Sequence, residues 1–121
     1  MALGLALLVL VLILVVGVGA VGTGIAAYVQ AAGAADAAAL AAAPVTFRSF
    51  GAQGPPRQEA ARFASANGTL LVECVCPVDR SWLPRTVSVT VSRSVELPGL
   101  GEFRVRATSR ATFEPEALLR P

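Results

Sequence analysis

The sequence predicts an α+β fold: a long N-terminal transmembrane α-helix followed by a small domain of one helix on a three-stranded antiparallel sheet. Two observations lead to this prediction. No side chain in residues 1–35 is charged. The later part of the chain contains three segments in which apolar and polar residues alternate, as in half-buried strands. We therefore expect a transmembrane and alanine-rich helix over residues 1–43, a linker over 44–54 and a small α+β domain over 55–121.

The apolar run contains a glycine pattern that also occurs in nucleotide-binding proteins. Residues 11–24, VLILVVGVGAVGTG, place Gly17, Gly19 and Gly22 in the spacing G-x-G-x-x-G, which brings the backbone of a βαβ unit close to a pyrophosphate. Such a fold needs several βαβ units and an acidic residue about 20 positions after the glycines. The chain has only 121 residues, and the only acid nearby is Asp36. We therefore favour a membrane helix, which needs about 20 apolar residues.

Length and charge distinguish this segment from a cleaved signal peptide. At about 1.5 Å per residue, residues 2–35 would extend roughly 50 Å as a helix, against about 30 Å for the hydrocarbon core of a bilayer. The helix should therefore protrude, and Tyr28 is a candidate for the membrane interface. No Lys or Arg precedes the run, although AAAP at 41–44 stays open as a cleavage site. The first basic residue is Arg48, so charge does not fix the orientation of the helix.

Small residues in this helix are candidates for contacts with other helices. Gly19 with Thr23, and Ala20 with Gly24, form small-xxx-small pairs that let two helix backbones approach closely. Glycine and alanine are, however, also common in membrane helices. The alanine-rich tract at 31–43 continues the helix with an almost smooth surface, which suggests an assembly element. The residues expected to pack against other helices are Gly17, Gly19, Ala20, Thr23, Gly24 and Asp36.

The small domain is predicted from one helical pattern and three strand patterns. Residues 55–66 have the spacing of a short helix, which the Asn-Gly pair at 67–68 would end. Residues 69–76 are apolar on both faces, so we expect a central strand that is buried on both sides. Residues 86–92 and 103–113 alternate, as in strands with one buried face. In the last strand the residues expected to face the core are Phe103, Val105, Ala107, Ala111 and Phe113.

Cys74 and Cys76 are the only cysteines, and the sequence leaves their pairing open. On one face of a regular strand they lie about 6.6 Å apart along the chain, against about 3.5–4.5 Å between the Cβ atoms of a disulfide. An internal bond therefore requires the strand to break, which Pro77 makes feasible. Bonds to partner chains and two free buried thiols are the alternatives. A domain of this size buries only about 60% of its unfolded surface, so we expect support from a neighbour, the N-terminal helix or a disulfide.

The composition offers no recognisable catalytic or metal-binding group. The chain has no histidine, which is the commonest general base, and two thiolates supply at most half of a tetrahedral zinc site. The acidic residues are scattered, and no Ser or Cys stands in a nucleophile motif. We therefore expect no enzymatic activity, no cofactor, no metal and no small-molecule substrate.

Two features of the small domain are candidates for partner contacts. Arg104, Arg106 and Arg110 share one face of the last strand and could bind an acidic partner, nucleic acid or anionic lipid. The formal net charge is only +2 and no aromatic residues are interleaved, so we expect a solvated face and no nucleic-acid binding. Trp82, in the turn DRSWLPR at 79–85, is the better contact candidate, with capping of the small core as an equal alternative.

The tract AADAAALAAA at 34–43, preceded by an uncharged apolar helix, resembles the N-terminal segment of the TadE/TadG-like proteins of Tad (Flp, tight adherence) pilus systems. More loosely, ANG at 66–68, LLVECVC at 70–76 and TVSVTVS at 86–92 are similar to features of short actinobacterial members. The resemblance implies a non-enzymatic minor pilin (pseudopilin) or assembly factor in the cell membrane. Its helix would cross the membrane once, its C-terminal domain would be extracytoplasmic, and the chain could be incorporated in a pilus. Its partners would be membrane lipid, other pilin-like subunits and Tad assembly proteins.

The sequence departs from that family at one point. Pseudopilins of these systems commonly carry a processing site with a glycine and, a few residues on, a glutamate, whereas the first glutamate here is Glu59. Either this chain acts as an unprocessed anchor, as TadG-like proteins are thought to, or upstream residues are missing. Two other functions stay as alternatives: a membrane-anchored envelope-binding module unrelated to pili, and a regulator whose domain faces the cytoplasm.

Overall fold

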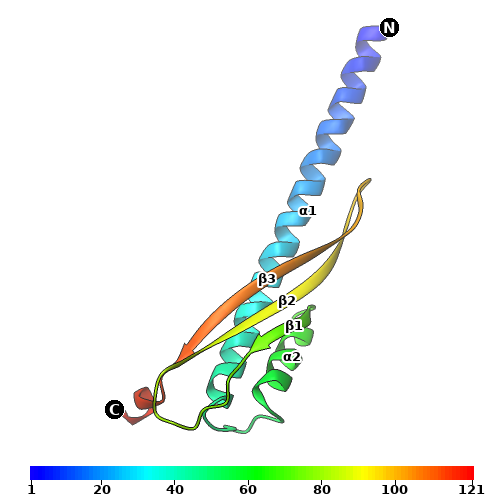
Figure 1. The fold of residues 1–121 in the computed structure, drawn as a ribbon. Helices are drawn as coiled ribbons and strands as arrows, with labels where there is room; N and C mark the ends of the chain where they lie inside the picture. Colours follow the sequence, from blue (N-terminus) through cyan, green and yellow to red (C-terminus); the bar gives the residue numbers. More distant parts are fainter.

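The computed structural model describes residues 1–121 and confirms the predicted α+β class. A long helix runs the length of the molecule, and a short helix and an antiparallel sheet of order β1-β2-β3 pack around its C-terminal half (Figure 1). The elements are α1 (Ala2–Val45), α2 (Pro56–Ala66), β1 (Leu70–Val75), β2 (Arg85–Leu97), β3 (Gly101–Phe113) and a short 3₁₀ helix, η1 (Pro115–Leu119).

Helix α1 continues two residues beyond the predicted end at residue 43. Pro44 lies in its last turn, and the Thr46 hydroxyl donates to the Ala43 carbonyl oxygen (2.6 Å), which satisfies one of the carbonyls that the end of a helix leaves free. Thr46 and Phe47 are buried, and the Asp79 N–H donates to the Thr46 carbonyl oxygen (2.9 Å). The predicted linker over 44–54 therefore begins with residues that belong to the packed core.

The C-terminal half of α1 forms the core together with β2 and β3. Val87, Val89 and Val91 of β2 are fully buried against it. Because alanine has no side chain beyond Cβ, the sheet can lie close to the helix backbone along the whole stripe. The buried residues of α1 are Ala20, Ala27, Ala31, Ala34, Ala35, Ala38, Ala39, Ala42 and Ala43. The alanine tract that the sequence suggests for assembly is thus used largely inside the chain, and the domain receives its extra support from the N-terminal helix.

Strand β1 differs from its prediction as a central strand buried on both sides. It pairs only with β2 and forms an edge of the sheet, and Leu70 and Val75 are exposed. A bulge between Leu71 and Glu73 shifts the register, so that Leu71 and Cys74 lie opposite Val91 and Val89 on the core side. The extra residue in a bulge breaks the period-two pattern, so the residues of β1 that face the core do not follow from alternation along the sequence.

Strands β2 and β3 form a long hairpin whose faces agree with the predicted alternation. Val105, Ala107, Ala111 and Phe113 are buried or half-buried toward α1, whereas Phe103 is 48% exposed near the tip. At the turn, the Leu100 N–H donates to the Leu97 carbonyl oxygen (3.1 Å), and Gly99 and Gly101 have positive φ angles of 77° and 88°. Pro-Gly at the centre of this turn suits that backbone. The hairpin crosses α1 obliquely and extends toward its N-terminal half (Figure 1).

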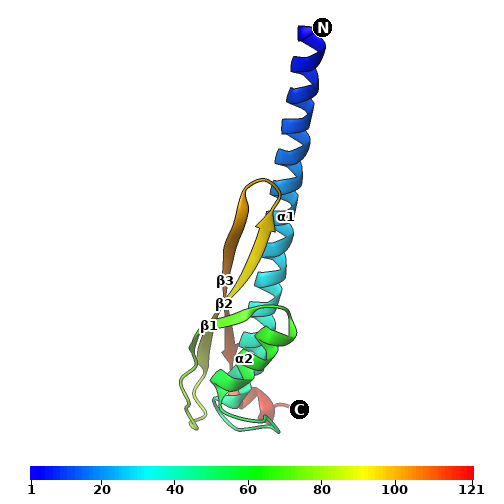
Figure 2. The same ribbon diagram turned by 90° about the vertical axis from the view of Figure 1, so that its right-hand side faces the viewer.

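Helix α2 packs beside α1 and β1, so that α1 and not α2 covers β2 and β3 (Figure 2). Ala60 and Ala64 are buried on its inner face. The helix ends at Ala66, and Gly68 follows with a φ of 75°, which confirms the predicted Asn-Gly stop. The Thr69 hydroxyl donates to the Ala64 carbonyl oxygen (2.9 Å) and ties the start of β1 to this helix end.

Candidate functional site

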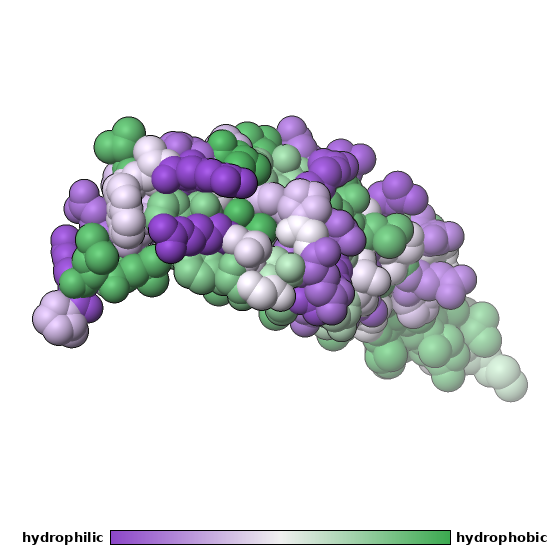
Figure 3. All heavy atoms as spheres, turned by 90° about the horizontal axis from the view of Figure 1, so that it is seen from below, coloured by the Kyte–Doolittle hydropathy of each residue, from purple (hydrophilic) through white to green (hydrophobic).

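The N-terminal half of α1 is the most unusual surface of the molecule. It is long and apolar enough to cross a membrane, and nearly all of its side chains are exposed, with Val18 at 73%. Seen from the opposite end of the molecule, this segment is a continuous hydrophobic group, whereas the surface of the domain mixes hydrophilic and hydrophobic residues (Figure 3). A soluble monomer rarely exposes an apolar surface of this extent. The segment is therefore the candidate site for contact with lipid or with other helices.

Two of the predicted helix-packing residues form a pair on the exposed surface of this segment. Gly19 and Thr23 are exposed, and the Thr23 hydroxyl donates to the Gly19 carbonyl oxygen (2.9 Å), so its polar group is satisfied within the helix. A Cβ atom at Gly19 would meet nothing within 4 Å. This surface of α1 thus has room for the backbone of a second helix. Gly17 is also exposed, but it lies on the side of α1 that faces the turn between β2 and β3.

The other predicted helix-packing residues lie on the side of α1 that faces the sheet. Ala20 is buried, and it continues the stripe of buried alanines that includes Ala27 and Ala31. Gly24 is half-buried on the same stripe. Asp36 is exposed, and its carboxylate accepts a hydrogen bond from the Ser109 hydroxyl of β3. Ala20 and Asp36 are therefore engaged inside the chain, and the pair Gly19 and Thr23 is the free one.

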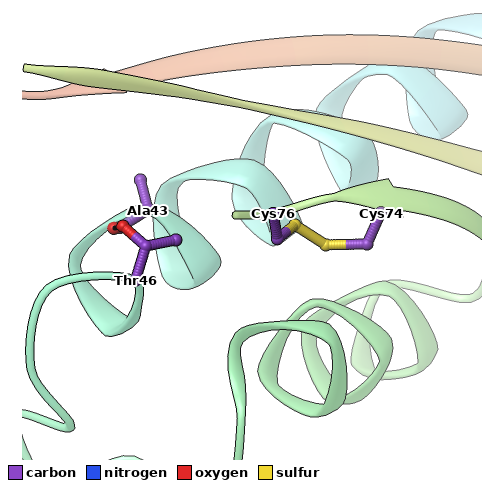
Figure 4. Close-up of a disulfide and its surroundings, with 4 residues drawn as sticks. All are labelled: Ala43, Thr46, Cys74 and Cys76. Atoms are coloured by element: carbon purple, nitrogen blue, oxygen red, sulfur yellow. Dashed lines mark hydrogen bonds between the residues drawn. A yellow bond between two sulfur atoms is a disulfide. The ribbon is translucent and has the colours of Figure 1, made fainter. Parts of the chain in front are cut away.

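Cys74 and Cys76 form an internal disulfide, one of the three alternatives that the sequence leaves open. The strand ends at Val75, so Cys76 lies just outside it, and the two Cα atoms are 5.4 Å apart, within the range of about 4.4–6.8 Å for disulfides. Both sulfur atoms lie on the same side of the chain, where the two cysteines pack against the core (Figure 4). The bond closes the end of the β1 edge strand.

Trp82 takes part in an aromatic cluster at the far end of α1. Its ring lies edge-on to Phe47, with the centroids 5.1 Å apart, while 42% of the residue stays exposed. Phe47 also contacts Phe113 (6.1 Å between centroids). Trp82 thus caps the small core, which is one of its two predicted roles. The other role, a contact with a partner, stays a prediction, and the exposed side of the ring is available for it.

Arg85 is a buried residue that sequence reasoning missed. Its guanidinium lies 5.5 Å from the centroid of Phe47, and Nη2 donates to the carbonyl oxygens of Ser81 and Leu83. Its Nε and Nη1 atoms are buried without a hydrogen-bond partner. The available signal was the period of β2, which places residue 85 on the same face as Val87.

Two carboxylates in the domain are held by specific hydrogen bonds. The Arg62 guanidinium donates to Glu59 (2.7 Å) and, with the N–H of Gln53, holds the pKa of that carboxyl below its ordinary value of 4.5, against the opposing effect of burial. The backbone N–H and the hydroxyl of Ser81 likewise lower the pKa of Asp79 from 3.8. These hydrogen bonds fix the loop that precedes α2 and the loop that precedes β2.

The predicted arginine row lies on the outward face of the sheet. Arg104, Arg106 and Arg110 are exposed, and the single salt bridge of the structure is the one between Arg62 and Glu59. Threonine pairs flank the row across the hairpin, among them Thr90 with Thr108 (2.8 Å between hydroxyl oxygens). The row is a solvent-exposed basic face that forms no salt bridge within this chain.

No group of three or more His, Cys, Asp and Glu side chains is placed to hold a metal ion. Comparisons of the chain with known protein families, with curated proteins and with solved structures found no match.

Proposed function

We propose that this chain is a non-enzymatic, membrane-anchored subunit of a Tad (Flp) pilus-type assembly, acting as a minor pilin or an assembly factor. The observation that carries the proposal is the double use of α1. Its N-terminal half is an exposed apolar span, and its C-terminal half is the core of the folded domain. One unbroken helix therefore joins the membrane to the domain, without a flexible linker between them.

This construction suits a subunit that is placed by its helix. Exposed apolar residues of a membrane segment must contact lipid or another apolar helix, and small residues let helices approach closely in lipid. Gly19 and Thr23 offer such a close approach on the face of α1 that the domain leaves free. Helices of like subunits would pack side by side there, and each domain would be carried at a fixed angle outside the cytoplasm.

The resemblance of residues 1–43 to TadE/TadG-like segments supports the choice of assembly. Its strongest part, the alanine tract at 34–43, also has a role within this fold, because it packs on the sheet. The tract alone therefore does not require a pilus, and it is the exposed half of α1 that favours assembly with other helices.

The test is in vivo photo-cross-linking from α1 in cells that also express the proteins encoded by the genes beside the gene for this chain. A photoreactive residue at Val18 should give adducts with the N-terminal helices of pilin-like subunits, identified by mass spectrometry. The matched position is Thr108 on the outward face of β3, which should give none. Gly19→Leu should abolish the Val18 adducts while the domain stays folded, because a side chain at Gly19 meets nothing in this chain. The exposed substitution Val21→Leu, a matched control, should leave them.

The alternative function, an envelope-binding module unrelated to pili, is favoured by the unpaired arginine row. It predicts adducts from position 108 with a non-pilin ligand, and their loss in Arg106→Ala. That outcome, together with lipid-only adducts from Val18, would replace the pilus proposal.

A further inference from the structure

The tip of the β2–β3 hairpin lies beside the apolar span of α1, well beyond the packed core (Figures 1 and 2). Between them is an open recess of about 400 Å³. Ile13, Val16 and Ala20 of α1 line one side, and Pro98 and Leu100 of the turn line the other. The recess is thus apolar on both sides and contains no charged residue.

The tip itself is apolar and exposed. Leu100 is 63% exposed and Phe103 is 48% exposed, and no residue from Leu97 to Gly101 is charged. The turn satisfies part of its own backbone through the hydrogen bond from the Leu100 N–H to the Leu97 carbonyl oxygen. Such a turn can leave bulk water at a lower cost than an open loop, whose backbone groups would be unpaired.

We propose that this hairpin tip is a second membrane contact. Pro98 and Leu100 would enter the boundary between the headgroups and the acyl chains, and the recess behind them would hold an acyl chain of a phospholipid. The inference rests on the proposed anchoring by α1 and adds the depth and the orientation of the domain.

The height of the tip along α1 favours lipid as the occupant over a second copy of the chain. Every residue of α1 from 2 to 19 is exposed, which is about the length of a membrane span, and the first buried residue is Ala20. The recess lies along the last turns of this exposed stretch, from Leu12 to Ala20. The tip therefore lies beside the domain-side end of the span, where the hydrocarbon gives way to the headgroups. An interfacial position suits a hairpin, because its outer edges keep access to water, whereas an open sheet edge does not occur within the hydrocarbon.

Two acidic residues limit how deep the tip can go. Glu96 and Glu102 lie directly opposite each other, one residue pair farther from the turn than Leu97 and Gly101. Carboxylates are costly in hydrocarbon, so this pair must stay at or above the headgroups. Tyr28 lies about 12 Å along the helix from Ala20, so in this arrangement it is outside the membrane interface, contrary to the position expected from the sequence.

The contact can be tested by fluorescence of the full-length chain in phosphatidylcholine vesicles. Trp82→Phe removes the only native tryptophan. Reporters are then placed singly by Leu100→Trp at the tip, Leu8→Trp in the span and Thr108→Trp on the outward sheet face. Vesicles whose acyl chains are brominated near the carbonyl end should quench the Leu100 reporter and shift its emission to the blue. Chains brominated near the methyl end should quench it less than they quench the Leu8 reporter, and the Thr108 reporter should not respond.

The outcomes separate this inference from the proposed function. Quenching of the Leu8 reporter without quenching of the Leu100 reporter would overturn the tip contact and leave the anchor in place. Absence of quenching from both would overturn the anchoring itself. A blue shift of the Leu100 reporter that disappears on dilution of protein in lipid would identify a second copy of the chain as the occupant, and would also overturn the inference.

Discussion

Asp36 of α1 accepts a hydrogen bond from the hydroxyl of Ser109 in β3, across a sequence separation of 73 residues. No other side-chain hydrogen bond joins α1 to the sheet. The rest of that contact consists of apolar side chains, mainly alanine on α1 and valine on β2, which give attraction but little directional preference. We infer that this one polar pair helps to set the position of the helix along the sheet.

The coupling between these two residues can be measured. Asp36→Ala and Ser109→Ala should each lower the free energy of unfolding, and a double-mutant cycle should give a coupling energy of about 0.5–1.5 kcal/mol, the usual size for a hydrogen bond. Chemical denaturation in detergent provides the measurement. Additive effects of the two substitutions would show that the bond contributes nothing to stability.

The buried alanine stripe should not accept larger side chains. Ala38 is fully buried between helix and sheet, so Ala38→Leu should cost about 1–3 kcal/mol of unfolding free energy through overpacking. Ala26 is exposed on the same helix, and Ala26→Leu is the matched control, with an expected change within about 0.5 kcal/mol. Equal effects at the two positions would contradict the packing described for α1.

The disulfide should contribute modestly to stability, because the loop that it closes is very short. Its two cysteines are only 2 residues apart, for which loop-closure entropy corresponds to about 1.5 kcal/mol. Thiol titration of the unfolded oxidised chain should find no free thiol, and Cys74→Ser with Cys76→Ser should leave a folded domain. A loss of all near-UV circular dichroism in the double variant would show that the bond is essential to the fold.

Acid should destabilise the domain through Glu59 and Asp79. The folded-state pKa of each lies below its ordinary value, 4.5 for Glu59 and 3.8 for Asp79. A lowered folded pKa gives stability that is fully present above the unfolded pKa and is lost as the pH falls through the folded pKa. The denaturant concentration at the midpoint of unfolding should therefore be constant above about pH 5.5 and should decrease below about pH 4.5.

Two variants test the source of this decline. Glu59→Gln combined with Asp79→Asn should flatten the pH dependence below pH 4.5. Glu116→Gln, at an exposed carboxylate of η1, should leave it unchanged. An unaltered decline in the first variant would assign the acid sensitivity to other groups.

Much of the architecture follows from hydrophobic patterning alone. The uncharged run over residues 1–35 predicts α1, and the alternation of valine with Ser and Thr predicts the buried face of β2, because these patterns extend over enough residues to exclude the other element type. The Asn-Gly pair at 67–68 predicts the end of α2, because glycine at that point accepts a positive φ.

Other features depend on packing that no local pattern records. Apolar residues on both faces of β1 predicted a central strand, whereas the strand order places β1 at the edge of the sheet. The bulge at Val72, which exchanges the faces of the strand, also leaves no mark in the local pattern. The alanine tract is smooth enough to pack on a sheet or on another helix, and only the complete fold decides between them. Only the complete fold likewise shows that Cys76 lies outside β1, where it can form a bond with Cys74 that a regular strand would forbid.

We propose that the folded domain lies outside the cytoplasm on a single membrane helix, and topology labelling of intact cells is the direct test. A probe cysteine replaces the exposed Ser49 in a chain carrying Cys74→Ser and Cys76→Ser, and intact cells are treated with a membrane-impermeant maleimide. We expect labelling of intact cells to the same extent as after lysis. Protection in intact cells followed by full labelling after lysis would place the domain in the cytoplasm and contradict the proposed topology.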